Sequence, residues 1–385
     1  MKHYRRIEKM QRCLILHFWA DVDTNPTLMG LMRHLIAAGF DIDLICETRD
    51  FFLPPSLPPE NITIHPVHSW RTCAQQLQET WPQKLRGGKY SFLIAVDPQG
   101  LYAAHYLFND LPVPLIYLSF EILFQDELKK QEEHDLKNIE REMSRRAALI
   151  IIQDEERGRL LAAENGLADH HFFYLPNAPA DVDSSGNASY LRDNFNIPAS
   201  KKIVLHTGSF DFWTAGEELI AAAAGIPDEF ILVIHSRQIP GKNDLISRMQ
   251  DIADPEKVCF STAPLAFDEY AQLVDSCDIG LVLYKISPTI FTQKNLFHIG
   301  LSSGKFAYFA RHGKPVITSD LPSYRTIFNQ SHNGVCAPKI SALGEILRAH
   351  SNQFTQMGRN NRLFFCDQLD FSQKIVPIMG KINSL

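Results

Sequence analysis

The chain has 385 residues, of which 45% are hydrophobic and 21% charged, and its net charge is -6. This composition excludes a disordered protein, because it supplies enough apolar surface for complete cores. The mild negative charge excludes nucleic acid as the main partner, since that role usually needs a strongly basic surface. A chain of this length normally folds as two domains.

The cysteines and the apolar runs indicate the compartment. The sequence has 7 cysteines, mostly inside apolar runs, with no CxxC pair, and this pattern is typical of reduced, buried thiols. No apolar run approaches the roughly 20 residues of a membrane span. We therefore expect a cytoplasmic protein. The basic start, residues 1–12, is either a solvated terminus or a peripheral contact with the acidic surface of the inner membrane.

The first half of the chain alternates short apolar runs with longer amphipathic stretches, which predicts a parallel sheet flanked by helices. Apolar residues repeat at helical spacing across residues 28–36. Residues 126–147 are rich in charge and predict a long, mostly exposed helix. Strands are expected at residues 13–18, 41–46, 61–64, 92–96, 115–118, 149–152 and 172–175.

The second half repeats this pattern after a stretch of small, polar and turn-forming residues at 177–187, which is typical of a linker. The sequence thus predicts an α/β fold of two Rossmann-like, doubly wound domains that face a cleft. Their expected limits are 1–180 and 181–368, and an amphipathic helix within 369–385 is expected to pack back on the first domain. In the second half, strands are expected at 203–205, 230–234, 258–260, 279–283 and 315–317, and helices at 217–224, 268–275 and 305–311.

One helix start in the second half has the groups that bind phosphate. Residues 302–305 read Ser-Ser-Gly-Lys and follow the strand at 279–283, and ligands of such sheets lie beyond the carboxyl ends of strands. Free N–H groups, two hydroxyls and the cation of Lys305 together suit a diphosphate. The alternative is an ordinary N-cap by Ser302 or Ser303 with an exposed lysine. His206 and His235 end two other strands and either reach the same phosphate or are only packed.

The helix that begins at Lys305 continues through Tyr308 to the segment Gly-Lys-Pro-Val-Ile at 313–317. This stretch resembles the helix that lies against the donor in nucleotide-sugar glycosyltransferases of the GT-B fold. Residues 206–211 are similar to the family's strand and glycine loop, and 258–265 to its nucleobase-holding turn. Residues 117–121 and 148–157 are similar to segments of its first domain. The tyrosine at 308 resembles the family 4-like branch of bacterial polysaccharide glycosyltransferases.

The resemblance implies an acceptor domain at 1–180 and a nucleotide-sugar donor domain at 181–368. It implies transfer of a sugar from a nucleotide diphosphate to a hydroxyl of a saccharide or lipid-linked saccharide. Retention of configuration, no bound metal and no further cofactor are expected. Lys305 is expected to act in catalysis by neutralising the leaving diphosphate. The donor-binding residues that the resemblance indicates are Gly208, Ser209, Arg237, Pro264, Leu265, Ser302, Ser303, Gly304, Lys305 and Tyr308.

The sequence departs from the family at three places. Many retaining members carry two glutamates eight positions apart, but Gly300 and Tyr308 stand here. Tyr308 is expected to offer a hydroxyl instead. The family's arginine and lysine after the first strand of the donor domain are also missing. Arg237 either takes their place or is an ordinary surface residue.

Polar residues follow two strands of the acceptor domain. Asp23 and Asn25 come after the first strand and are expected to contact the acceptor, unless they only form a turn that caps the next helix. Glu121 follows the fifth strand and is expected to orient the acceptor or to act as a catalytic base, with an exposed loop charge as the alternative. Asp97 is expected to cap the helix that follows the fourth strand.

Two other functions stay open at this point. Nucleotide-sugar epimerases and hydrolases share the fold, and for them we expect a denser set of carboxylates and histidines. A nucleotide-sugar-binding partner subunit without catalysis is the second alternative, and the missing glutamates and cations favour it. The sequence does not identify the sugar, the nucleobase, the acceptor, the linkage or the oligomeric state.

Overall fold

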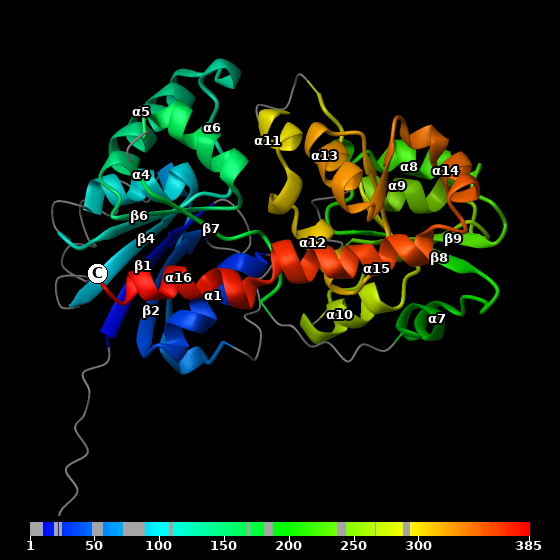
Figure 1. Cartoon of the computed structure of the whole chain (residues 1–385), viewed down its shortest axis with the longest axis horizontal. Coiled ribbons are helices and arrows are strands. Elements are labelled where there is room, and N and C mark those ends of the chain that lie inside the picture. The colour runs from blue at the N-terminus through cyan, green and yellow to red at the C-terminus, as the bar shows by residue number, and fades with distance from the viewer. Residues whose placement is uncertain are drawn as a thin grey trace, which may run out of the picture. The chain divides into compact units, whose positions relative to one another are not determined.

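The computed structural model describes residues 11–18, 22, 25–47, 57–71, 89–107, 111–167, 170–180, 188–236, 244–265, 267–287 and 293–385. The chain forms two compact units. Unit 1 is Met1–Pro176 with Phe371–Leu385, and unit 2 is Asn177–Asp370. Each unit has a parallel sheet with helices on both faces (Figure 1). This arrangement confirms the α/β class of two Rossmann-like domains that the sequence predicts.

In the described part of unit 1 the sheet is 7-stranded, in the order β3-β2-β1-β4-β5-β6-β7. All the strands predicted for this half are present. They are β1 (Gln11–His17), β2 (Phe40–Glu47), β3 (Ile62–Val67), β4 (Tyr90–Val96), β5 (Leu115–Leu118), β6 (Leu149–Ile152) and β7 (Phe172–Tyr174). The helices are α1 (Pro26–Ala37), α4 (Asp97–Leu107), α5 (Gln131–Arg145), α6 (Glu155–Asn165) and α16 (Phe371–Ile382), with the short turns η2 (Pro59–Asn61) and η3 (Gln125–Glu127).

The central strands of unit 1 are almost entirely apolar because helices cover both faces of the sheet. β5 and β6 are buried at every position. On one face α1 and α16 pack together, and on the other α4 packs against α5 (Figure 1). α6 begins where the Asp154 side chain accepts the Arg157 N–H at 2.8 Å, and it ends at Gly166, whose φ of 67° is left-handed.

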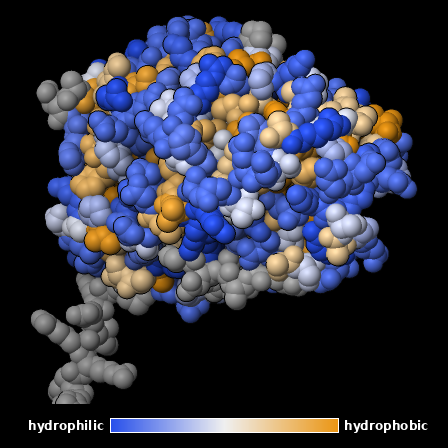
Figure 2. Space-filling view, turned by 45° about the vertical axis from the view of Figure 1, so that its right-hand side comes forward, coloured by the Kyte–Doolittle hydropathy of each residue, from blue (hydrophilic) through white to orange (hydrophobic). Residues whose placement is uncertain are grey.

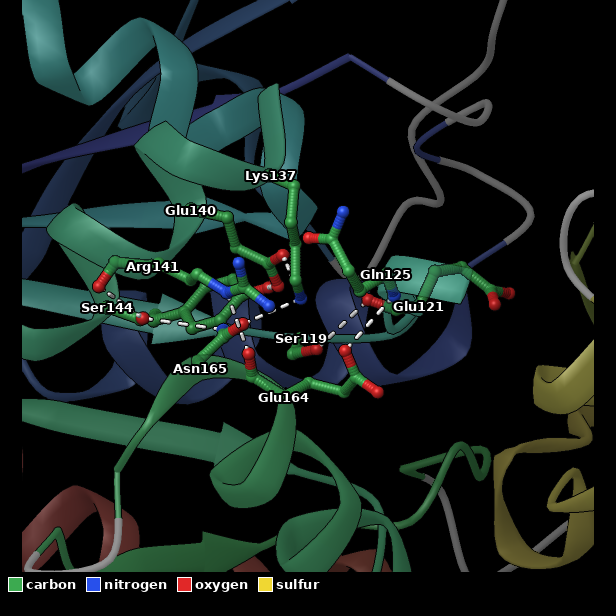
Figure 3. A network of polar contacts seen from close by, with 10 residues as sticks. Ser119, Glu121, Gln125, Lys137, Glu140, Arg141, Ser144, Glu164 and Asn165 are labelled. Atoms are coloured by element: carbon green, nitrogen blue, oxygen red, sulfur yellow. Dashed lines mark hydrogen bonds and ion pairs between the residues drawn. The ribbon is translucent and has the colours of Figure 1, made fainter. Parts of the chain in front are cut away.

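A buried ion pair fastens α5 to its neighbours (Figure 3). Lys137 Nζ donates to Glu140 Oε2 at 2.8 Å and to Asn165 Oδ1 on α6 at 2.6 Å. The Tyr117 hydroxyl on β5 donates to Glu140 Oε1 at 2.9 Å, and burial together with the Glu140 charge raises the pKa of Tyr117. The prediction of a mostly exposed helix is wrong for Lys137 and Glu140, which are both buried. Their burial is possible because the two opposite charges pair with each other on the same helix.

In the described part of unit 2 the sheet is 6-stranded, in the order β10-β9-β8-β11-β12-β13. Its strands are β8 (Lys202–Thr207), β9 (Phe230–His235), β10 (Val258–Ser261), β11 (Ile279–Val282), β12 (Val316–Ser319) and β13 (Gly334–Ala337). The helices are α7 (Tyr190–Phe195), α8 (Gly216–Ala223), α9 (Asp244–Ile252), α10 (Phe267–Asp275), α11 (Gln293–Phe297), α12 (Gly304–Arg311), α13 (Pro322–Ser331), α14 (Leu343–Ala349) and α15 (Phe354–Phe364). Shorter segments are η4 (Phe212–Thr214), η5 (Gly300–Ser302), η6 (Ile340–Ala342) and the π-helical η7 (Phe365–Leu369).

Close packing against the sheet fixes the position of α12. Phe306 and Phe309 are fully buried and lie on one face of the helix, three residues apart. A Cβ atom at Gly280 on β11 would lie 2.4 Å from the Phe309 ring, so only glycine allows the helix to approach the strand this closely. The start of α12 is therefore held one turn away from these contacts.

The surface and the helix lengths bear on membrane contact. On the face shown in Figure 2, the described residues present mostly polar side chains, with apolar ones in small groups between them. None of the described helices is long and apolar enough to cross a membrane.

The buried pair on α5 makes a prediction about stability. We expect Lys137→Met to lower the free energy of unfolding by about 3–5 kcal/mol, because it leaves the Glu140 carboxylate buried without its cation. Arg146→Met, at the end of the same helix, removes the exposed pair with Glu142 and is expected to cost less than about 1 kcal/mol. Urea denaturation of the full chain measures both, and equal losses would contradict the prediction.

Candidate functional site

The loop after β8 forms the floor of the candidate site. The strand ends at Thr207, and Gly208 follows with a φ of 89°, a left-handed value that glycine adopts without strain. The Gly208 N–H donates to the His235 carbonyl at the end of β9 at 3.1 Å. The Ser209 carbonyl interacts with His206 Nε2 at 3.1 Å. These contacts hold the loop against the carboxyl ends of the neighbouring strands β8 and β9.

The side chain of Lys305 lies across this glycine. Lys305 is the second residue of α12, and a Cβ atom at Gly208 would lie 2.9 Å from its Cε. The Lys305 Nζ is 5.6 Å from the centre of the Trp213 ring and 5.5 Å from that of Tyr284. The two rings stack on each other at 5.7 Å. Gly208, Lys305 and this aromatic pair therefore form one cluster.

The ammonium group of Lys305 is buried and unpaired. Its Nζ has no hydrogen-bond partner among the described residues. Burial lowers the pKa of Lys305 to about 8, and the charge of Asp211 opposes this shift. The Asp211 carboxylate itself accepts the N–H of Trp213 at 2.9 Å. An unpaired buried cation is a strong attractor for an anion, because an anion would supply the missing charge.

Two histidines beside the cluster are neutral near pH 7. Burial and the charge of Lys305 lower the pKa of His206 to about 3. Burial lowers the pKa of His235 to about 4, and its Nδ1 interacts with the Ser261 hydroxyl at 2.9 Å. Among the described residues around this loop, Lys305 therefore supplies the positive charge, and the histidines offer neutral polar groups.

The serines at the start of α12 have local roles. The Ser303 hydroxyl caps the helix by accepting the Phe306 N–H at 3.3 Å, and it interacts with the Tyr284 hydroxyl at 3.0 Å. The Ser302 hydroxyl donates to the Ile299 carbonyl at 2.6 Å. The capping that the sequence offered as an alternative is therefore present. The first N–H groups of the helix, at Gly304 and Lys305, still have no carbonyl of an earlier turn to bond.

The remaining donor residues indicated by the sequence lie around the same end of the sheet. The Tyr308 ring is 4.8 Å from the ring of Tyr270, whose hydroxyl accepts a hydrogen bond from the Thr207 hydroxyl at 3.1 Å. Pro264 and Leu265 follow β10, two strands from β8 in the sheet; Pro264 is exposed and Leu265 is half-buried. Arg237 lies outside the described residues.

The residues indicated for the acceptor belong to unit 1. The Asn25 side chain accepts the Leu28 N–H at 2.9 Å, which makes it the N-cap of α1. Glu121 follows β5, and burial raises the pKa of its carboxyl group while Arg157 opposes the shift. Asp23 lies outside the described residues.

Asp97 does not act as the sequence predicts. Asp97 is the first residue of α4, and its carboxylate accepts the backbone N–H groups of Phe120 and Glu121. The expected cap is wrong because Asp97 adopts a φ of 60°, which turns the carboxyl group toward the end of the neighbouring strand β5.

Sequence reasoning missed the aromatic cover of Lys305. From sequence alone, an aromatic run such as Phe210, Phe212 and Trp213 in a loop fits stacking on a sugar, filling of a hinge or, most often, a place in the core. The structure separates them: Phe210 is fully buried, Phe212 is 51% exposed, and Trp213 stacks on Tyr284. Tyr284 carried no signal, because a tyrosine at the end of an apolar strand is an ordinary feature.

A cavity of about 570 Å³ lies elsewhere in unit 2, along α8 and beside the ends of β11, β12 and β13. None of the donor residues indicated by the sequence lines it. Tyr284 belongs to its wall and also covers Lys305, so a molecule in this cavity would touch the same tyrosine. The described residues hold no group of three or more His, Cys, Asp or Glu side chains that could bind a metal ion.

Solved structures identify the fold. No protein-family model matches the chain, and no curated protein matches its sequence. Sucrose-phosphate synthase from Thermosynechococcus elongatus superposes with a TM-score of 0.73 at 15% identity, covering 97% of this chain and 98% of that one. HepE of Anabaena, in complex with UDP and glucose, gives 0.72 at 15% identity, covering 97% and 100%. A putative UDP-N-acetylglucosamine 2-epimerase from Listeria monocytogenes gives 0.65 at 12%, covering 97% of each chain. The chain therefore has the GT-B fold.

Lys305 makes the first prediction about binding. We expect Lys305→Met to raise the Kd for inorganic pyrophosphate roughly 10- to 100-fold, because a charge-assisted contact to the anion is lost. The melting temperature of the free protein should not fall, since the variant removes an unpaired buried charge. Lys202→Met, at the opposite end of β8, is the matched control and should bind pyrophosphate normally. Isothermal titration calorimetry measures the affinities, and an unchanged Kd for Lys305→Met would contradict the assignment.

Proposed function

We propose that this chain is a glycosyltransferase that takes a sugar from a nucleotide diphosphate and transfers it to a hydroxyl of a saccharide or lipid-linked saccharide. The observation that carries the proposal is the Lys305 ammonium group, buried and unpaired over Gly208. A diphosphate supplies the two things this position lacks, a negative charge and hydrogen-bond acceptors. The free N–H groups at the start of α12 add donors for the same anion.

The fold supports a nucleotide sugar as the source of that diphosphate. HepE was solved with UDP-glucose as well as with UDP and glucose, and it shares the architecture over nearly the whole of both chains. In a doubly wound sheet the ligand lies beyond the carboxyl ends of the strands, which is where Gly208 and Lys305 meet. We therefore assign unit 2 the donor and unit 1 the acceptor.

The transfer step places a clear demand on charge. The bond between the anomeric carbon and the diphosphate oxygen breaks, and its electron pair stays on the diphosphate. The acceptor oxygen forms the new bond to that carbon, and its proton leaves to Glu121 or to the departing diphosphate. Lys305 stabilises the negative charge that develops on the leaving group. We propose that the reaction retains configuration and uses no metal ion, and that the protein works in the cytoplasm, in solution or at the inner membrane.

The epimerase of similar fold motivates a second candidate, a nucleotide-sugar epimerase or hydrolase. Such chemistry needs acid–base groups close to the sugar. The described titratable groups near Lys305 include His206, Asp211 and Tyr284, and each already has a partner within the unit. This supports transfer over epimerisation. A binding partner without catalysis is the remaining alternative.

A panel of nucleotide sugars separates these functions. We expect at least one nucleotide diphosphate sugar to raise the melting temperature, and release of nucleotide diphosphate to depend on an added saccharide acceptor. Release of diphosphate without acceptor would indicate a hydrolase, and a changed sugar still attached to its nucleotide would indicate an epimerase. Stabilisation without turnover would indicate a binding subunit. No stabilisation by any nucleotide would overturn the proposal.

The lowered pKa of Lys305 makes donor binding depend on pH. The ammonium form binds a diphosphate, and in the free protein this form is lost as the pH rises through about 8. We expect the affinity for UDP to be constant between pH 7 and 7.5 and to fall by up to about tenfold per pH unit above pH 8. Lys305→Met should bind weakly with no such fall. Calorimetry across pH 7–9.5 measures this, and a flat profile for the natural protein would contradict it.

A further inference from the structure

The end of β5 in unit 1 is held by a buried carboxyl group. Asp97 Oδ1 accepts the Phe120 N–H at 2.6 Å and the Glu121 N–H at 2.9 Å. Asp97 is 3% exposed and adopts a φ of 60°, a left-handed value that costs free energy in a residue with a side chain. A buried acid with a strained backbone thus binds the backbone N–H groups of Phe120 and Glu121.

Two side chains, one on α6 and one just before it, hold the backbone around Phe120 from the other side. Arg157, which is 1% exposed, donates from Nη2 to the Phe120 carbonyl at 2.6 Å and from Nε to Gln153 Oε1 at 2.7 Å. Gln153 in turn donates to the Ser119 carbonyl at 2.6 Å. The backbone on both sides of Phe120 is therefore fixed by side chains that solvent does not reach.

The Glu121 side chain, which this segment carries, is half-buried. In Figure 3 it extends away from the buried Lys137, Glu140 and Asn165 network. Its own backbone carbonyl accepts the Ser119 hydroxyl at 3.2 Å. A backbone held so firmly fixes the point from which the Glu121 carboxyl group extends, and an acid–base group that must be aimed needs such a fixed point.

We propose that Asp97 is the positioning residue of Glu121, and that the two carboxyl groups act as one acid–base pair that accepts the proton of the acceptor hydroxyl. The chemistry of the proposal rests on the transfer reaction proposed above. In that step the acceptor O–H bond breaks, its proton passes to Glu121, and its oxygen forms the bond to the sugar. Asp97 acts through Glu121 and does not touch the acceptor.

The electrostatics support a coupled pair. Burial raises the pKa of Asp97 to about 7, the charge of Glu121 adds to the shift, and the two backbone N–H groups and Arg157 oppose it. Burial also raises the pKa of Glu121, with Arg157 as the opposing cation. On β5, the pKa of Tyr117 is raised as well, with Asp97 among the causes. The charge of Glu121 therefore helps to raise the Asp97 pKa to about 7, and the two groups titrate as a coupled pair.

Carboxyl NMR on the full chain tests the coupling without any nucleotide sugar. The protein is labelled with ¹³C at the side-chain carboxyl carbons of Asp and Glu and titrated from pH 4 to 9. The signal missing from Asp97→Asn belongs to Asp97, and the signal missing from Glu121→Gln belongs to Glu121. We expect Glu121→Gln to lower the Asp97 midpoint by about one pH unit, because the neighbouring charge is gone. Glu142→Gln, an exposed change on α5, should leave the midpoint in place.

A second pair of variants tests the positioning. Asp97→Asn keeps an acceptor oxygen for both N–H groups, so the Glu121 signal should keep its position but lose its second step near pH 7. Asp97→Ala removes the acceptor and should shift the Glu121 signal. If Glu121→Gln leaves the Asp97 midpoint unchanged, the proposed coupling of the two carboxyl groups is overturned. If Asp97→Ala leaves the Glu121 signal unchanged, the positioning role of Asp97 is overturned. If Asp97→Ala does not fold, Asp97→Asn still decides the coupling. Failure of donor binding would be seen only in the nucleotide panel.

Discussion

The ammonium group of Lys305 is taken out of water without an acceptor for its hydrogen bonds among the described residues, and the surrounding structure offsets part of that cost. Removing an unpaired charge from water is unfavourable by several kcal/mol. The lowered pKa of about 8 is the measure of this cost in the free protein. The faces of Trp213 and Tyr284 offset part of it through cation–π attraction. This uncompensated cost is the physical basis of the proposal that Lys305 binds an anion.

Two glycines make the buried position of Lys305 possible. One faces the helix that carries the lysine, and the other faces the lysine side chain. Gly280 lets α12 lie against β11, which places the helix start, and Gly208 leaves room for the Lys305 side chain. A methyl group at either position would meet atoms closer than 3.0 Å. The cluster around Lys305 therefore depends on packing as well as on charge, because both close approaches require a glycine. This is preorganisation, in which the protein meets the cost of desolvation on folding and not when the ligand arrives.

The sequence predicts the fold more fully than the site. Apolar runs give the strands and their alternation with helices, because a parallel sheet covered on both faces allows little else. The helix start at Lys305 is readable in two ways, because serine, glycine and lysine at a helix start suit a phosphate site as well as an ordinary N-cap. The tertiary partners are not readable. The turn of Asp97 toward β5, the cover of Tyr284 over Lys305 and the inward pair Lys137 and Glu140 all depend on contacts between residues distant in sequence.

Burial acts on the two units with opposite chemical results. It disfavours the charged form of any group, so it lowers the pKa of the lysine in unit 2 and raises the pKa of the carboxyl groups Asp97 and Glu121 in unit 1. The lysine becomes a cation that gains most from meeting an anion. The carboxyl groups become bases whose proton affinity lies closer to neutral pH. Leaving-group stabilisation and proton removal are the two demands of the proposed transfer to a hydroxyl, and desolvation alters the proton affinity of each group to which the proposal gives one of these tasks.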